Sequence, residues 1–126
     1  MATLSRFDNE RYLNLETYRR NGVGVRTPVW FAAGVGKLYI YAIADSGKVK
    51  RVRRNPAVRI APCDVRGTVS GPWIDAVVNV VDREEFKVGM RLLDKKYFPW
   101  KQFLKLLAMF SRRERVVLAI AEPPPG

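Results

Sequence analysis

The chain of 126 residues contains no histidine and a single cysteine, Cys63. Without histidine, neither the Cys–His nor the Ser–His pair that activates a nucleophile can form, and the usual zinc sites are excluded. One cysteine cannot form a disulfide within the chain. Because Cys63 ends an apolar run, we interpret it as a packed residue rather than a nucleophile. We therefore expect no catalytic side chain of the nucleophilic kind and no metal site, so that any chemistry must come from a cofactor.

Long hydrophobic runs are also missing. No apolar run approaches the roughly 18–20 residues that span a membrane, and residues 1–10 are polar with mixed charge, which is not typical of a signal peptide. We therefore expect a cytoplasmic protein without a membrane span. Apolar residues make up 48% and charged residues 28%, as in ordinary globular proteins. The length fits one domain, so we expect residues 1–126 to form a single domain.

Acidic residues are few, with 12 Asp and Glu against 23 Lys and Arg, and the formal net charge is +11. Such an excess of positive charge predicts an anionic partner. The partner could be a nucleic acid, an acidic membrane surface or a phosphorylated small molecule. Charge alone does not choose among these three.

The densest positive charge lies in one short segment that follows an apolar, aromatic run. The segment opens with Asp45 and Ser46, which are good helix N-caps, and it ends at Asn55 and Pro56, where a helix naturally stops. No acidic residue follows Asp45 before Asp64. The basic residues of this predicted helix are Lys48, Lys50, Arg51, Arg53 and Arg54.

A helix of this composition is electrostatically unfavourable on its own. Each like-charged pair at i,i+3 or i,i+4 costs roughly 0.2–0.5 kcal/mol, and a cation near the helix N-terminus costs about 0.3–1 kcal/mol. A bound anion would reverse both penalties, because backbone N–H groups, the Ser46 hydroxyl, Lys48 and Arg51 would converge on it. The segment predicts a phosphate site, although a solvated basic helix face explains these residues equally well.

Alternation and short apolar runs predict six strands, at residues 12–18, 25–33, 37–43, 57–61, 68–81 and 115–122. Pro28 cannot donate to a ladder, so its strand should lie at an edge or be locally unpaired. Gly71 and Pro72 should bend the strand that contains them. Six short strands, mostly with one apolar face, favour a small β-barrel with helices packed outside it.

Two further helices are predicted after the long strand. Asp82 and Glu85 match a capping box at the start of the first of them. Apolar residues at helical spacing predict its inward face: Phe86, Met90, Leu93 and Tyr97. Phe98 and Pro99 interrupt this helix, and residues 100–110 predict a second amphipathic helix.

Several motifs follow one another in an order that is more specific than any one of them. They are Thr27-Pro28-Val29-Trp30-Phe31, Leu38-Tyr39, Asp45-Ser46-Gly47-Lys48-Val49-Lys50-Arg51 and Asn55-Pro56, with residues 58–64 and Gly71-Pro72-Trp73 as later additions. In this order, residues 12–93 resemble the flavin/deazaflavin-dependent oxidoreductases of the pyridoxamine-phosphate-oxidase-like split β-barrel superfamily. The branch it resembles most is usually assigned to the deazaflavin coenzyme F-420.

The resemblance implies a mainly β fold with flanking helices: a six-stranded split β-barrel (the FMN-binding split barrel), homodimeric, with cofactor sites at the subunit interface. It implies that Ser46, Lys48 and Arg51 hold the cofactor phosphate and that residues 27–30 lie beside the tricyclic ring, largely through backbone groups. Ala42 stands where this branch more often has a hydroxyl residue. The full set of expected cofactor-binding residues is Thr27, Pro28, Val29, Trp30, Tyr41, Ala42, Ser46, Gly47, Lys48 and Arg51.

A cofactor-based reaction also accounts for the absence of histidine, because hydride transfer is the cofactor's own chemistry. The sequence therefore predicts an oxidoreductase that binds coenzyme F-420 (8-hydroxy-5-deazaflavin) or FMN and transfers hydride to a small-molecule substrate. Solvent or Tyr41 would supply any proton that the reaction needs.

Two alternatives from other classes remain. One is a non-catalytic protein that sequesters a flavin, a deazaflavin or a related tetrapyrrole. The other is a β-barrel that binds single-stranded nucleic acid by stacking bases on aromatic side chains. The predicted strands lack the alternation of aromatic and basic residues that such platforms show, so we expect no nucleic-acid partner.

Overall fold

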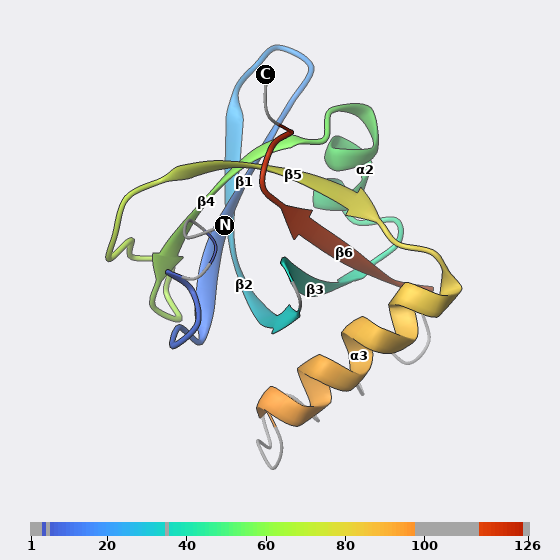
Figure 1. The fold of residues 1–126 in the computed structure, drawn as a ribbon. Helices are drawn as coiled ribbons and strands as arrows, with labels where there is room; N and C mark the ends of the chain where they lie inside the picture. The colour runs from blue at the N-terminus through green and yellow to red at the C-terminus, as the bar shows by residue number, and fades with distance from the viewer. Residues whose placement is uncertain (1–3, 5, 35, 98–113, 125–126) are drawn as a thin grey trace.

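The computed structural model describes residue 4 and residues 6–34, 36–97 and 114–124. Its strands and helices, in chain order, are β1 (Tyr12–Tyr18), β2 (Gly24–Gly34), β3 (Lys37–Ile43), α2 (Gly47–Arg54), β4 (Ala57–Cys63), β5 (Ile74–Val80), α3 (Arg83–Tyr97) and β6 (Arg115–Ala121). The six strands close into an antiparallel barrel in the order β1-β2-β3-β6-β5-β4 (Figure 1). The predicted six-stranded barrel with flanking helices is confirmed.

Alternating side chains of the strands fill the inside of the barrel. Leu13 and Leu15 of β1 and Ile40 of β3 are fully buried there. On the outer side, β3 carries Tyr39 and Tyr41, which belong to separate apolar clusters. This alternation is the period of two expected for a strand that separates a core from a second layer.

Helix α2 packs at one end of the barrel and α3 lies against its outside. Val49 and Val52 of α2 are buried within the barrel core, and the helix contacts β1 and β5. Helix α3 contacts β2, β3 and β6, and Phe86 packs there against Tyr39 (Figure 1). Among the described residues, no helix is both long and apolar enough to cross a membrane.

Strand β2 has an unpaired edge over the half that contains Pro28. It pairs with β1 over its length from Gly24 to Trp30, but it pairs with β3 only from Phe31 to Gly34. A proline cannot donate to a ladder, and here its strand lacks the second neighbour. The expected local loss of pairing around Pro28 is confirmed.

The start of α3 matches only half of the predicted capping box. The N–H of Glu85 donates to Oδ1 of Asp82 at 2.9 Å, which caps the helix as expected. The Glu85 carboxylate does not complete the box. It accepts hydrogen bonds from Nζ of Lys37 and from the hydroxyl of Tyr39, both at 2.8 Å, and so ties α3 to β3.

The strand predicted at residues 68–81 is too long, since β5 spans only Ile74–Val80. After a turn in which Oδ1 of Asp64 accepts the N–H groups of Arg66 and Thr68, Val69 makes only an isolated bridge to Cys63 and the chain bends at Gly71. Strand β4 is longer than predicted, because it continues through Pro62 to Cys63. The predicted helix at residues 100–110 lies outside the described residues.

Candidate functional site

The start of α2 leaves a buried polar group without a partner. Ser46 is the N-cap residue, with extended backbone angles, but its side chain makes no capping hydrogen bond. Its Oγ is buried and has no hydrogen-bond partner among the described residues. The N-cap predicted at Asp45 or Ser46 is confirmed at Ser46, but the hydroxyl makes no capping hydrogen bond, so its hydrogen-bonding capacity is not used within the described part of the chain. The helix stop at Asn55 is confirmed.

The first turn of α2 contains Lys48 and no acidic residue, and Arg51, in the last turn, reaches back with its guanidinium toward Gly47. Burial lowers the pKa of the half-buried Lys48, and the charge of Arg51 lowers it further. Burial also lowers the pKa of Arg51, together with the charges of Arg19 and Arg54. These shifts show that positive charge is crowded and poorly hydrated at this end of α2.

Gly47 makes room for the Arg51 guanidinium. A Cβ atom on Gly47 would lie 2.7 Å from Nη1 of Arg51, closer than the two atoms can approach. The Nε of Arg51 donates to Oγ1 of Thr17 in β1 at 2.6 Å, which holds the side chain against the barrel. The guanidinium is thereby placed over the first turn of α2.

The residues predicted to lie beside a ring divide between the two sides of the barrel wall. Trp30 and Tyr41 pack in one apolar cluster outside the barrel, near the point where β2 and β3 separate. The side chains of Val29 and Ala42 point into the barrel core and are 9% and 1% exposed. Only backbone groups of Val29 and Ala42 are thus available to a ligand outside the barrel.

The structure thus forms two groups of predicted site residues. Ser46, Gly47, Lys48 and Arg51 meet at the start of α2, and Trp30 meets Tyr41 on the outer wall. Residues 42–45 connect the two groups along the chain. The two groups are also linked through β1, because Arg51 donates to Thr17 of β1 and β1 pairs with β2. The exposed ring of Pro28 instead lies beside Gly67.

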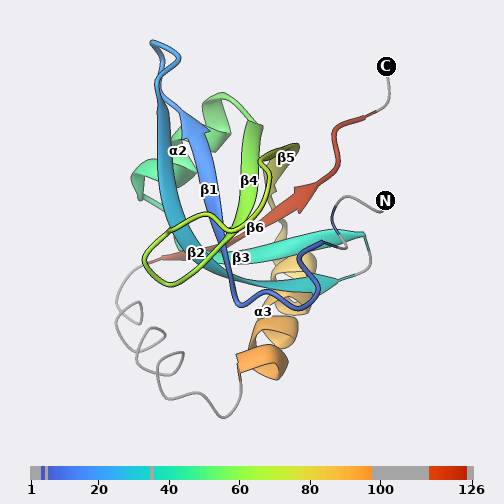
Figure 2. The same ribbon diagram turned by 90° about the vertical axis from the view of Figure 1, so that its left-hand side faces the viewer.

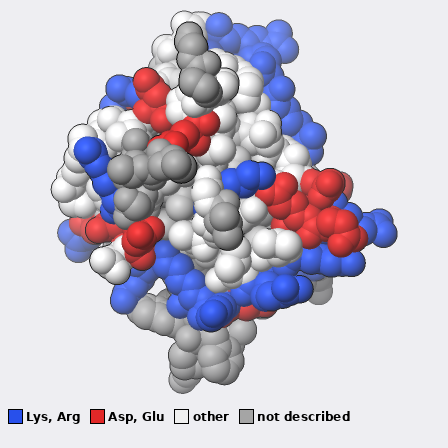
Figure 3. Space-filling view, in the orientation of Figure 1, with Lys and Arg blue, Asp and Glu red and all other residues white. Residues whose placement is uncertain are grey.

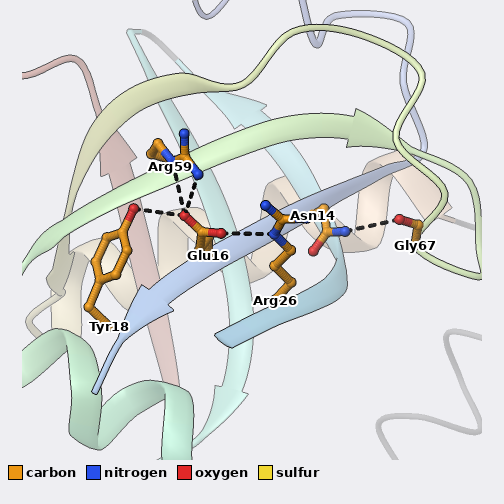
Figure 4. A network of polar contacts seen from close by, with 6 residues as sticks. All are labelled: Asn14, Glu16, Tyr18, Arg26, Arg59 and Gly67. Carbon is orange, nitrogen blue, oxygen red and sulfur yellow. Dashed lines mark hydrogen bonds and ion pairs between the residues drawn. The ribbon is translucent and has the colours of Figure 1, made fainter. Parts of the chain in front are cut away.

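A polar network on the outer side of β1 was missed by the sequence interpretation (Figure 4). The Glu16 carboxylate, 5% exposed, accepts hydrogen bonds from Tyr18 at 2.8 Å, from Nε of Arg26 at 2.8 Å and from Nε of Arg59 at 2.9 Å. Burial alone raises the pKa of Glu16, but these hydrogen bonds and the charge of Arg59 outweigh it and lower the pKa to about 2. The carboxylate is therefore ionised and fully engaged.

The same network holds the loop that follows β4. The guanidinium carbons of Arg26 and Arg59 lie 4.6 and 5.4 Å from the centre of the Trp73 ring. Nδ2 of Asn14 donates to the carbonyl of Gly67 at 3.0 Å. Figure 2 shows this loop crossing in front of β1 and β2. The one signal in the sequence was the pairing of Glu16 with Arg26 across a predicted hairpin.

These features define the chain, by its fold, as a six-stranded split β-barrel, and one solved structure with this fold is a putative pyridoxamine 5'-phosphate oxidase, 15% identical with a TM-score of 0.66. No family model matches the sequence, and no curated protein sequence matches it. Solved structures do match, at sequence identities that show the fold alone.

Three of these solved structures show that proteins with different descriptions share this fold. The conserved hypothetical protein Rv2991 of Mycobacterium tuberculosis is 23% identical, with a TM-score of 0.72, over 98% of this chain and 80% of that one. HutZ, the heme storage protein of Vibrio cholerae, is 14% identical with a TM-score of 0.66, over 99% and 90%. An F420 reductase is 17% identical with a TM-score of 0.55, over 95% and 93%.

Proposed function

We propose that this chain binds a phosphorylated flavin-type cofactor, coenzyme F-420 or FMN, with the cofactor phosphate at the start of α2. The observation that carries the proposal is the Ser46 hydroxyl, which is buried and unpartnered at the N-cap of a helix whose first turn contains Lys48 and no acidic residue. Leaving a buried polar group unpaired costs about 1–3 kcal/mol. A phosphate oxygen would accept its hydrogen bond and remove that cost.

The charges at this helix end support a phosphate rather than a neutral group. An anion at a helix N-terminus is stabilised by the helix dipole and by the unsatisfied N–H groups of the first turn. Lys48 and the guanidinium of Arg51 would add charge-assisted hydrogen bonds. Bringing a phosphate to this position would also relieve the mutual repulsion of the two cations.

The tricyclic ring is proposed to lie along the outer wall where β2 and β3 separate. Residues Thr27, Pro28, Val29 and Trp30 are on the half of β2 that forms no ladder with β3. Their backbone would contact the ring, while Tyr41 and the Trp30 side chain would line its surroundings. Ala42 and Gly47 would contribute backbone only.

When bound, such a cofactor supplies hydride transfer, and we propose that it reduces a small-molecule substrate. The chain's own residues would bind the phosphate, orient the ring and exclude water from it. We also propose that a second copy of the chain completes the site, as in a homodimer, and that the protein works in the cytoplasm. F-420 reductase activity in a structure of the same fold supports this proposal by analogy.

A storage or sequestering role is the second candidate. It is favoured by the shared fold with a heme storage protein. The two candidates differ in turnover: an enzyme re-oxidises its reduced cofactor when a suitable acceptor is added, whereas a carrier releases the cofactor unchanged. Absorbance of the reduced, bound cofactor after addition of nitro-aromatic or quinone acceptors distinguishes them.

The binding test is a fluorescence titration of the stripped protein with FMN and with F-420 at two salt concentrations. We expect one of them to bind, more weakly at high salt. Lys48→Ala should weaken binding by about 1.5–3 kcal/mol, roughly 10- to 150-fold, because it removes a charge-assisted contact. The matched control is Lys50→Ala, an exposed lysine of the same helix. Binding of neither cofactor, or equal losses in the two variants, would reject the proposal.

A further inference from the structure

A hollow of about 430 Å³ lies outside the predicted cofactor set, at the junction of three elements. Arginines from each of them line it: Arg53 of α2, Arg83 of α3 and Arg115 of β6. Its apolar lining consists of Val80, Val81, Phe86 and Val116. This volume lies within the range of about 300–1,000 Å³ typical of small-molecule pockets.

A second hollow, of about 360 Å³, adjoins the first. The two share Arg53 and Val80, so that Arg53 stands between them. The lining of the second hollow is mixed, with Asn79 beside Val52, Pro56 and Val78. Together the two hollows form one surface in which valines lie on both sides of Arg53.

The arginines of the first hollow are not neutralised by neighbours. Within the described part of the chain, the side chains of Arg53 and Arg83 make no hydrogen bond or ion pair. Nη1 of Arg115 lies 3.5 Å from the Tyr41 hydroxyl, which is a weak contact. Three guanidinium groups therefore have donors available for a ligand.

Two acidic residues, Asp82 and Glu114, also line the hollow and bear on its preference. Oδ1 of Asp82 already accepts the N–H of Glu85, at the positive end of the α3 dipole. Figure 3 shows Lys and Arg side chains over α2 and acidic side chains beside the start of α3. With three cations against two anions, one of which caps a helix, the lining favours a negatively charged ligand.

We propose that this hollow is a binding site for a small amphipathic carboxylate. The planar guanidinium forks of Arg53 and Arg83 match a carboxylate in geometry, and the valine lining would take its apolar body. The site does not depend on a flavin, so the proposal goes beyond the proposed function. Arg115 lines the hollow and also contacts the Tyr41 hydroxyl, so the Arg115 side chain would lie between a ligand in the hollow and the proposed ring site.

The test uses methyl NMR of valine-labelled protein titrated with four probes: benzoate, benzamide, benzylamine and inorganic phosphate. Benzoate should give saturable shifts of the Val80, Val81 and Val116 methyl signals. Benzamide has nearly the same shape without the charge, and it should bind at least tenfold more weakly. Phosphate alone should leave these methyl signals unshifted at the same concentrations.

Arg53→Gln and Arg83→Gln should each weaken benzoate binding at least fivefold. Arg91→Gln removes an exposed arginine of α3 that does not line the hollow, and it should not change binding. The methyl spectrum of each free variant checks that it folds.

The proposal is overturned by benzamide binding as well as benzoate, by preferential binding of benzylamine, by phosphate shifting the same methyls, or by equal losses in all three variants. Loss of cofactor binding in Lys48→Ala with benzoate binding intact would separate this site from the proposed phosphate site.

Discussion

Two groups of cations in this barrel use the same residue types in opposite ways. On the outer wall, Arg26 and Arg59 close around the buried Glu16 carboxylate and stack on Trp73. At the start of α2, the Ser46 hydroxyl is unpartnered, and the first turn contains Lys48 but no acidic residue. The outer-wall arginines thus share a carboxylate as counter-charge, whereas the first turn of α2 contains none.

The two groups carry the same kind of charge, so the difference in their roles depends on which residues surround each cation. Glu16 joins β1, β2 and β4 through side-chain bonds, so its network holds the wall next to the unpaired half of β2. At the helix end, Arg51 makes one such bond, from its Nε to Thr17 of β1, while the Ser46 hydroxyl makes none. Variants that remove one element from either group should therefore affect different properties.

The largest effect on stability should come from Glu16→Gln. It leaves Arg26 and Arg59 without their counter-charge and weakens three hydrogen bonds to a charged group. We expect the free energy of unfolding to fall by about 2–3 kcal/mol, below the usual loss for a fully buried pair because both arginines are partly exposed. Urea unfolding measures it. Glu84→Gln, which breaks only the exposed 3.7 Å pair with Lys87, is the control and should cost under about 0.5 kcal/mol.

The second effect is the acid sensitivity of the same network. Glu16 has a pKa of about 2 in the folded protein and an ordinary pKa of 4.5 when unfolded. Between these values the unfolded chain binds more protons than the folded protein. The contribution of Glu16 to the free energy of unfolding is therefore fully present above pH 4.5 and is lost as the pH falls toward 2. Melting temperatures recorded from pH 6 to pH 2 should decline less steeply in Glu16→Gln. Parallel curves for the two proteins would contradict this role of Glu16.

A smaller effect is expected at the helix end from Gly47→Ala. The new Cβ would displace the Arg51 guanidinium from its place at 2.7 Å, so cofactor binding should weaken by about 1 kcal/mol, roughly fivefold. Because Ala favours a helix and φ at Gly47 is not positive, stability should stay equal or rise by about 0.4–1 kcal/mol. Titration and urea unfolding of one preparation measure both. Lower stability with unchanged binding would show that Gly47 has a purely structural role.

The smallest change in stability should come from Ser46→Ala. A capping serine costs about 1 kcal/mol when replaced by Ala, but this hydroxyl makes no capping bond. We expect the free energy of unfolding to change by less than about 0.5 kcal/mol, while cofactor binding weakens by about 0.5–1.5 kcal/mol. Asn55→Ala, at the other end of α2, is a comparison that should leave binding unchanged. A clear loss of stability without loss of affinity would make Ser46 a helix cap after all.

Local patterns predicted the parts of the fold that depend on neighbouring residues. The bounds of β1 and β3 and the ends of α2 follow from periodicity and from cap and stop residues. The strand before α3 was predicted too long, because the chain bends at Gly71 and regular pairing begins only at Ile74, while Val69 makes just an isolated bridge to Cys63. A predicted bend at Gly71 and Pro72 therefore marked the start of the strand rather than a curve within it.

The candidate site divides in the same way. Lys48 and Arg51 are three residues apart on one short helix that Ser46 begins, so the proximity of the two cations followed from the helical repeat. The network on the outer wall instead brings Arg59 to Glu16, 43 positions away in the chain, and adds Trp73 from the next loop. The side of the wall that Ala42 faces was also not predictable without the barrel.

The sequence by itself determined what depends on composition and short range: no histidine chemistry, an excess of positive charge, a barrel of six strands and a cationic helix start. Only the tertiary structure decided which cations are already neutralised, that the Ser46 hydroxyl is buried without a partner, and that Arg53, Arg83 and Arg115 share one hollow. The physical reason is that burial and ion pairing depend on distances between segments, and closing the barrel sets those distances.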